Sequence, residues 1–221
     1  MKKLNWKKYI GLIGILFLFP LILLLIFGKM GNHHFGKPKY FGPNAMTGAD
    51  TTDYQLPPFV FTNQSGEAFA SDSLQGKIWV AAFYSLTDSN AAKITERLLN
   101  INFKYRVRQE IAIVAFSTNP SADTPEALSS YINQVNRYNI KADKWQFLTG
   151  QSSVMESFMR NAFLIEDISN EAIFRLVDHH GQIRGLYGNT EYHMEDLMED
   201  ISAISKSIKV EKYNKKHEND K

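Results

Sequence analysis

The sequence predicts an α/β domain, with a central mixed β-sheet flanked by helices, preceded by one N-terminal transmembrane helix. Two observations lead to this prediction. Short, uniformly apolar runs, typical of strands covered on both faces, alternate with segments of helical periodicity. Before them, the 18 residues from Ile10 to Phe27 carry no charge and consist mainly of Ile, Leu and Phe. The alternation predicts the sheet, and the long apolar run predicts the membrane helix.

The apolar run has the length and the flanks of an uncleaved anchor. At about 1.5 Å per residue its helix measures roughly 27 Å, close to the hydrocarbon thickness of a bilayer. A cleaved signal peptide has a shorter apolar region that ends at small residues, whereas this run ends in Phe27-Gly28-Lys29-Met30. Four lysines precede the run, which favours a cytoplasmic N-terminus. We therefore expect a single-pass membrane protein whose remaining chain lies on the extracytoplasmic (periplasmic) side.

Composition divides the chain into four expected parts. Residues 1–28 form the cytoplasmic flank and the anchor, and residues 29–55 form a linker rich in Gly, Pro, Asn and Thr. Residues 56–206 form one domain, because some 150 residues suffice for a single hydrophobic core. Residues 207–221 form a charged tail, which we expect to be a solvated, frayed end.

The first half of the domain begins with a hairpin and continues with two strand–helix units. The hairpin pairs residues 59–62 with 67–70 around an Asn-Gln-Ser-Gly turn. The apolar runs 78–84 and 110–116 predict buried strands, and the near-helical spacing of apolar residues in 90–103 predicts the helix between them. Asp123-Thr-Pro-Glu126 is typical of a helix start, with a cap, a first-turn proline and an acid, and this helix should reach about residue 138.

The second half continues with a short strand, a helix, a hairpin and a closing helix. Residues 145–149 are expected to be extended, and residues 153–163 helical. A hairpin joins 173–177 to 182–187 through Asp178-His-His-Gly181. Apolar residues line one face of the last helix: Met194, Leu197, Ile201, Ile204 and Ile208. This order matches a thioredoxin-like architecture, although other α/β sandwiches fit the elements nearly as well.

The composition also excludes several classes of function. The chain has no cysteine, which removes thiol catalysis, disulfide exchange and every Cys-ligated metal centre. A thioredoxin-like or peroxiredoxin-like enzyme is excluded with them. Behind the anchor lie 21 of the 25 basic residues and all 23 acidic ones, a net charge of −2 that does not attract nucleic acid. The sequence has no P-loop, G-x-S-x-G or H-E-x-x-H motif, so we expect a protein that is not an enzyme.

Several motifs occur in an order and spacing that resemble one family. They are Pro58-Phe-Val-Phe-Thr-Asn-Gln-Ser-Gly66, Leu74-Gln-Gly-Lys77, Phe116-Ser-Thr-Asn-Pro-Ser-Ala-Asp-Thr-Pro-Glu126 with Tyr131, Trp145-Gln-Phe-Leu-Thr-Gly150 and Leu176-Val-Asp-His-His-Gly181. Together they resemble the Sco/SenC family over roughly residues 56–204. This resemblance implies a membrane-anchored, thioredoxin-fold copper chaperone of cytochrome c oxidase assembly.

The resemblance fails at the copper site. The family holds copper by a C-x-x-x-C pair after the second strand and by one distal histidine, and these positions fall on Thr87, Ala91 and Asn170. Alanine has no donor, and neutral oxygens of Thr and Asn do not replace soft thiolates. We therefore expect no copper cofactor and no metal ligand among these three residues. We expect the surface around them to be a docking face for a respiratory oxidase subunit or assembly factor.

A second hypothesis is a weak copper carrier outside the cytoplasm that uses histidine and methionine, such as His179, His180 and Met155. Adjacent histidines in an extended segment point to opposite faces, so the pair is expected to be two exposed turn residues and not a chelate. The pair His33 and His34, in the linker, is expected to be interfacial and not ligating. The Asp178–Gly181 turn should lie at the opposite end of its strand from Asn170.

Overall fold

The computed structural model describes residues 16, 18–20, 22, 38–42, 54–136, 144–165 and 174–218. The chain divides into two compact units, residues 1–36 and 37–221. In the first unit the described residues, between 16 and 22, are helical. No helix within the described residues has both the length and the apolar character needed to cross a membrane. Most of the predicted anchor lies outside the described residues, so the anchor stays a prediction.

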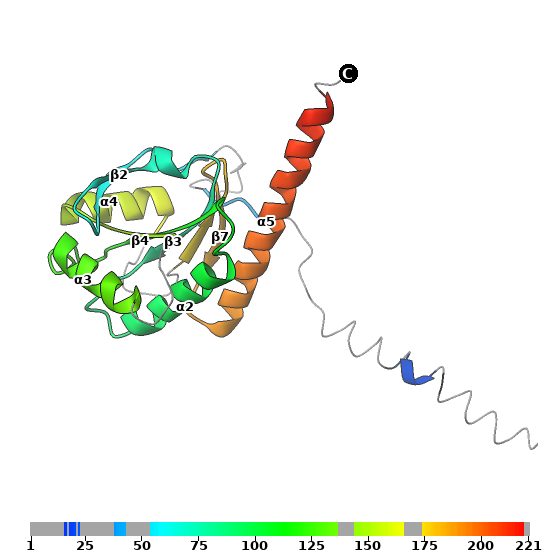
Figure 1. The fold of residues 1–221 in the computed structure, drawn as a ribbon, viewed down its shortest axis with the longest axis horizontal. Coiled ribbons are helices and arrows are strands. Elements are labelled where there is room, and N and C mark those ends of the chain that lie inside the picture. The colour runs from blue at the N-terminus through cyan, green and yellow to red at the C-terminus, as the bar shows by residue number, and fades with distance from the viewer. Residues whose placement is uncertain are drawn as a thin grey trace, which may run out of the picture. The chain divides into compact units, whose positions relative to one another are not determined.

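The second unit is built around one mixed sheet (Figure 1). Within the described residues its seven strands have the order β2-β1-β5-β4-β3-β6-β7. The strands are β1 (Val60–Asn63), β2 (Ala68–Ala70), β3 (Ile78–Phe83), β4 (Ile111–Phe116), β5 (Trp145–Thr149), β6 (Phe174–Val177) and β7 (Ile183–Tyr187). The helices are η2 (Ser71–Leu74), α2 (Ala91–Lys104), α3 (Pro125–Asn136), α4 (Ser152–Phe163) and α5 (Glu191–Glu218).

The centre of the sheet is parallel and its flanks are antiparallel. Strand β4 pairs in parallel with β3 and with β5, and α2 and α3 are the helices between these strands in the chain. On either side, β1 pairs antiparallel with β5, and β6 pairs antiparallel with β3. The carboxyl ends of β3 and β4 therefore share one edge of the sheet with the start of β6. The β6–β7 turn lies at the opposite edge, beside the start of β3.

Two hydrophobic cores lie on the two faces of the sheet. In β3, Ile78, Val80 and Ala82 point into one core, and the residues between them, such as Trp79, point into the other. The first core is covered by α2, α3 and α5 and the second by α4, which lies on the other side of the sheet in Figure 1. Burial on both faces explains why β3 and β4 are continuous apolar runs and not alternating ones.

The strands and helices expected from the sequence are present within the described residues, with three differences. A short 3-10 helix, η2, follows the first hairpin. Helix α3 is described as far as Asn136, and its predicted end near residue 138 lies outside the described residues. Helix α5 runs on to Glu218, through the residues expected to be a frayed tail. No Gly or Pro interrupts residues 191–218, and Lys and Glu, which are frequent there, favour helix.

Part of the predicted linker is attached to the domain. The guanidinium of Arg184 donates to the carbonyl oxygens of Pro38 (2.7 Å) and Lys39 (3.3 Å) and lies 3.9 Å from the centre of the Tyr40 ring. Phe41 forms a β-bridge with Ile183. Residues 38–42 therefore belong to the folded unit, because an arginine on β7 supplies donors that the linker composition does not reveal.

Candidate functional site

The positions expected to match the family's copper ligands begin at Thr87, where two loops leave the sheet. One loop follows β3 and leads into α2, and the other follows β4 and leads into α3. Because β3 and β4 are parallel, both loops lie at the same edge, where α/β folds commonly bind ligands. Thr87 lies in the first loop, and Ala91 is the first residue of α2. Asn170 lies outside the described residues.

A buried carboxylate connects the two loops. Asp123 is fully buried, and its Oδ1 accepts the backbone N–H of Leu86 (3.1 Å). Its Oδ2 accepts the hydroxyl of Ser117, which is also fully buried (2.5 Å). The side-chain cap of α3 is instead Thr124, whose hydroxyl accepts the N–H of Ala127 (3.3 Å). Sequence reasoning assigned Asp123 only to the helix start, because its partner Leu86 is 37 residues away in the chain.

The hydroxyl of Thr87 belongs to a second set of hydrogen bonds at this edge. Thr87 Oγ1 lies 2.8 Å from Ser85 Oγ and accepts the side-chain amide of Asn119 at 3.4 Å. The same Ser85 accepts the N–H of Thr87 (3.1 Å), and Asp88 accepts the N–H of Ser85 (2.7 Å). The side chains of Ser85, Thr87 and Asp88 therefore form hydrogen bonds with neighbouring side chains or with the backbone of the first loop. The edge is therefore a polar, internally bonded surface.

The second predicted position does not face solvent. Ala91 is 6% exposed and packs in the core under α2, so it cannot form part of a docking surface as expected from the sequence. Its N–H closes the turn before the helix by donating to the carbonyl of Asp88 (3.0 Å). The face of α2 that starts at Ala91 continues through Ile94, which is 1% exposed. Of the two described positions, only Thr87 is exposed.

A tyrosine pair anchors α2 behind this edge. The Thr95 hydroxyl lies 2.6 Å from the hydroxyl of Tyr131 on α3 and 3.4 Å from that of Tyr84. Burial raises the pKa of the Tyr84 phenol well above its ordinary value, against the hydrogen bond with Thr95, so the ring is neutral. The three hydroxyls tie both helices to the end of β3 and keep the loops in place.

The residues at this edge do not fit copper. The donors of Thr87, Ser85 and Asn119 are neutral oxygens or an amide that already donates, and Ala91 offers none. Soft thiolates and thioethers are the ligands that Cu(I) prefers. Met155, named in the second hypothesis, is fully buried in the core under α4 and is not available at the surface. The described side chains at this edge therefore supply neither a thiolate nor a thioether to copper.

The opposite edge holds the Asp178–Gly181 turn, as the sequence predicts. Trp79, near the start of β3, pairs with Val177, the last residue of β6, which places the turn far from the loop that carries Thr87. Asp178 is 1% exposed and bonds Arg184 at 2.8 Å. Its other oxygen accepts the N–H groups of His180 (3.0 Å) and Gln182 (3.1 Å). This carboxylate fixes the turn, which is a structural role.

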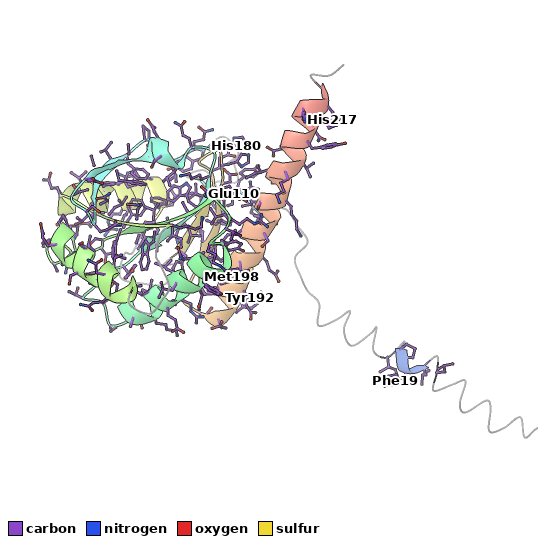
Figure 2. All side chains as sticks on the ribbon, viewed as in Figure 1. Phe19, Glu110, His180, Tyr192, Met198 and His217 are labelled. Carbon is purple, nitrogen blue, oxygen red and sulfur yellow. The ribbon has the colours of Figure 1, made fainter. Side chains whose placement is uncertain are left out.

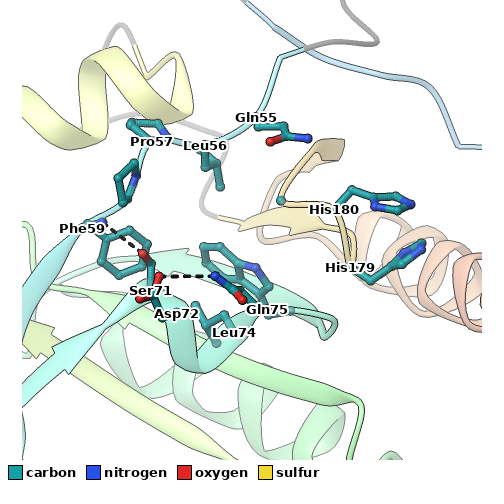
Figure 3. A pocket seen from close by; sticks show the side chains of 13 residues that line it. Gln55, Leu56, Pro57, Phe59, Ser71, Asp72, Leu74, Gln75, His179 and His180 are labelled. Atoms are coloured by element: carbon teal, nitrogen blue, oxygen red, sulfur yellow. Dashed lines mark hydrogen bonds between the residues drawn. The ribbon is translucent and has the colours of Figure 1, made fainter.

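The two histidines of this turn differ from the expectation. Their ring centres are 3.8 Å apart, and Figure 3 shows both rings on the same side of the turn, above the ribbon of α5. The side chain of His179 is only 14% exposed. Adjacent residues of an extended strand would diverge, but these two lie in a turn, where that rule does not hold. The pair also borders a pocket of about 210 Å³ whose walls include Trp79, Leu56 and Gln75 (Figure 3).

Comparison with known proteins identifies the family. The sequence matches the SCO1/SenC family model over residues 47–206. The chain belongs to the SCO1/SenC family. This SCO1/SenC chain is 27% identical over 170 residues to the SCO1 protein homolog of Bacillus subtilis, an alignment that covers 71% of this chain and 86% of the relative.

Solved structures agree with the fold of this SCO1/SenC chain. BsSco, described as a member of the Sco family of cytochrome c oxidase assembly proteins with a disulfide switch, superposes with a TM-score of 0.59 at 27% identity, covering 71% of this chain and 96% of that one. A SCO1/SenC family lipoprotein from Bacillus anthracis gives 0.59 at 23% identity, covering 70% and 96%. Arabidopsis thaliana ScoI, solved with copper bound, gives 0.55 at 17% identity, covering 69% and 99%.

Proposed function

We propose that this protein is a membrane-anchored accessory factor of cytochrome c oxidase assembly that docks an oxidase subunit or another assembly factor. It does so without family-type copper binding, thiol redox chemistry or enzymatic activity. Membership of the SCO1/SenC family supports the pathway, since the relative BsSco belongs to cytochrome c oxidase assembly proteins. The hydrogen-bonded edge around Thr87 and Asp123 supports the loss of copper chemistry, because its described side chains include no soft donor.

The loop edge supports docking because it is preorganised. Asp123 bonds to Leu86 and Ser117 on the two loops, and Thr87 bonds to Asn119 across them. Loops held in one conformation lose little entropy on association, which favours binding. Their exposed residues are mostly neutral hydroxyls and amides: Thr87, Ser89, Asn90, Asn119 and Ser121. Such a surface suits a protein partner recognised by hydrogen bonds and by shape.

The proposed location follows from the sequence and from a relative. The Ile10–Phe27 run has the length of a membrane span, and the four lysines before it favour a cytoplasmic N-terminus. The similar protein from Bacillus anthracis is a lipoprotein. This chain has no cysteine for such a lipid, so the apolar run is the proposed anchor that keeps the domain on the extracytoplasmic side of the membrane.

The test is co-purification of respiratory subunits with the tagged full-length chain from native membranes. We expect oxidase subunits to accompany the wild type and to be lost from Thr87→Arg, which places a long cation on the proposed docking surface. The matched control is Val107→Arg, because Val107 is 79% exposed in the turn that leads into β4, at the other edge of the sheet. Equal recovery with all three chains, or no oxidase subunit with the wild type, would contradict the proposal.

A further inference from the structure

The strongest unassigned feature is the group formed by His179, His180 and Glu211. One donor atom from each of these side chains lies within 4.8 Å of the other two, and within the described part of the chain no other group of histidine and acidic side chains converges in this way. His179 Nε2 and Glu211 Oε2 are 3.3 Å apart. We propose that these three residues bind one divalent transition-metal ion of the class that prefers imidazole, Cu(II) or Zn(II).

The distances fit such an ion. Ligands that lie about 2.0–2.1 Å from a tetrahedral ion are roughly 3.3–3.4 Å from one another. The His179–Glu211 separation of 3.3 Å already has this value. His180 is exposed and its side chain has room to turn, so its nitrogen can approach from within 4.8 Å. Two imidazoles and one carboxylate form a three-ligand set that leaves a coordination position for water or another ligand.

The turn that presents the histidines is rigid. Asp178 accepts backbone N–H groups from His180 and Gln182, and its pair with Arg184 is buried. Gly181 closes the turn at φ +78°, in the left-handed region that favours glycine. A rigid turn presents its two rings before the metal arrives, and such preorganisation strengthens binding.

Glu211 reaches the turn because α5 continues beyond the core. Ile201, Ile204 and Ile208 form the buried stripe of this helix, and Glu211 follows at the next i, i+3 position. Glu211 therefore lies on the same face of the helix as the buried isoleucines but beyond the core, where it contacts His179. The third ligand therefore depends on the helical extension through residues 207–218.

The imidazole of His179 has unused bonding capacity. Its Nδ1 is buried and has no hydrogen-bond partner within the described residues, and its Nε2 contacts only the Glu211 carboxylate there. Structural histidines that are buried commonly use both ring nitrogens. Packing, and not a hydrogen bond to Nδ1, therefore holds the ring in place, and Nε2, which faces Glu211, is the nitrogen that would bind the metal. Because the site lies at the edge opposite Thr87, this inference is independent of the proposed function.

The test is calorimetric titration of the full-length chain in detergent with Cu(II), Zn(II) and Mg(II). We expect one tight site for Cu(II) and Zn(II), tighter for Cu(II), and none for Mg(II), which prefers oxygen ligands. The double variant His179→Ala/His180→Ala should lose the site, and Glu211→Gln should weaken it about tenfold. Nitrogen hyperfine coupling from two imidazoles in the Cu(II) EPR spectrum should disappear in the double variant.

Matched controls separate this site from background binding. His33→Ala/His34→Ala removes the other adjacent histidine pair, and His217→Ala removes another histidine of α5. Both should bind as the wild type does. The proposal is overturned if the wild type shows no one-to-one site, if His33→Ala/His34→Ala abolishes it, or if Glu211→Gln binds with unchanged affinity. Since the side chain of Glu211 is 48% exposed, its replacement does not endanger the fold.

Discussion

At the edge where β3 and β4 end, the side chains of Asp123, Ser117 and Thr87 are engaged in hydrogen bonds within the protein. At the opposite edge, Asp178 is engaged in the same way, but the neighbouring His179 ring keeps a nitrogen without a partner among the described residues. Polar residues alone therefore do not mark a binding site. The two edges differ in whether a polar side-chain atom remains without a hydrogen-bond partner among the described residues, as His179 Nδ1 does.

Helix α5 packs along the sheet, from the end of β7 to the Asp178–Gly181 turn. Figure 2 labels Tyr192 and Met198 toward one end of this helix and His217 toward the other. The Tyr187 hydroxyl at the end of β7 donates to Asp200 (2.5 Å), and His179 meets Glu211 eleven residues further along. The Tyr187–Asp200 bond and the His179–Glu211 pair therefore fix two different parts of the same helix.

The largest effect is expected at the buried ion pair. Arg184→Ala leaves the Asp178 carboxylate, which is 1% exposed, without its cation, and removes the hydrogen bonds to the carbonyls of Pro38 and Lys39. Removing one partner of a buried pair costs about 3–5 kcal/mol. Urea unfolding of the full chain measures this. In the double variant Arg184→Ala/Asp178→Asn the loss should be smaller than the sum of the single losses. A loss below about 1 kcal/mol for Arg184→Ala would show that this edge is not held by the pair.

A smaller loss is expected at the loop edge. Asp123→Ala removes the acceptor of the Ser117 hydroxyl and the Leu86 N–H, both in the loops. Each donor left without a partner costs about 1–3 kcal/mol. Hydrogen exchange of the Leu86 amide should accelerate together with the fall in unfolding free energy. Asp72→Ala, at an exposed acid in η2, is the control and should change neither quantity. Unchanged protection of Leu86 in Asp123→Ala would contradict the bridging role.

Thr87→Val should have a modest effect. The Thr87 hydroxyl is exposed and shares its bonds with Ser85 and Asn119, so its loss costs about 0.5–1.5 kcal/mol. Thermal unfolding measures this. Binding of Cu(II) and Zn(II) should be unchanged, because the proposed metal site lies at the other edge. Weaker metal binding in Thr87→Val would connect the two edges and contradict their separation.

The smallest expected effect is a pH dependence of the unfolding free energy, caused by Asp200 on α5. Burial raises the pKa of Asp200, with the carboxylates of Asp196 and Glu199 adding to the rise against the hydrogen bond from Tyr187. The folded state then holds this proton more tightly than the unfolded chain. The stabilising contribution is complete below the ordinary Asp pKa and is lost as pH rises through the raised folded pKa. Asp200→Asn should flatten this decline in urea unfolding measured from acid to neutral pH. If the unfolding free energy of Asp200→Asn fell more steeply with pH than that of the wild type, the raised pKa of Asp200 would be contradicted.

The sequence predicted the sheet well because its signals are local. The apolar runs that became β3 and β4 are continuous, since both faces of those strands are buried. The Asp178–Gly181 turn was predicted from its position between two strands and its glycine, which has positive φ. Even η2, which was missed, is only one turn of helix after a hairpin that was predicted.

The candidate sites were predicted less well because they depend on long-range contacts. Thr87 was correctly placed at a loop, but the burial of Ala91 depends on how α2 packs, which its sequence neighbours do not reveal. The role of Asp123 depends on Leu86, a distant residue that offers only its backbone. Glu211 was missed because the buried apolar stripe of α5 ends at Ile208, which made the following charged residues resemble a tail.

The most direct test of the central claim is a Cu(I) titration of the full-length chain against a competing chelator, beside the double variant His179→Ala/His180→Ala. We expect both chains to leave Cu(I) with the chelator, because the chain has no thiolate and neutral oxygens do not replace one. One-to-one Cu(I) binding by the wild type would contradict this expectation, and its persistence in the double variant would place the copper away from the Asp178–Gly181 turn.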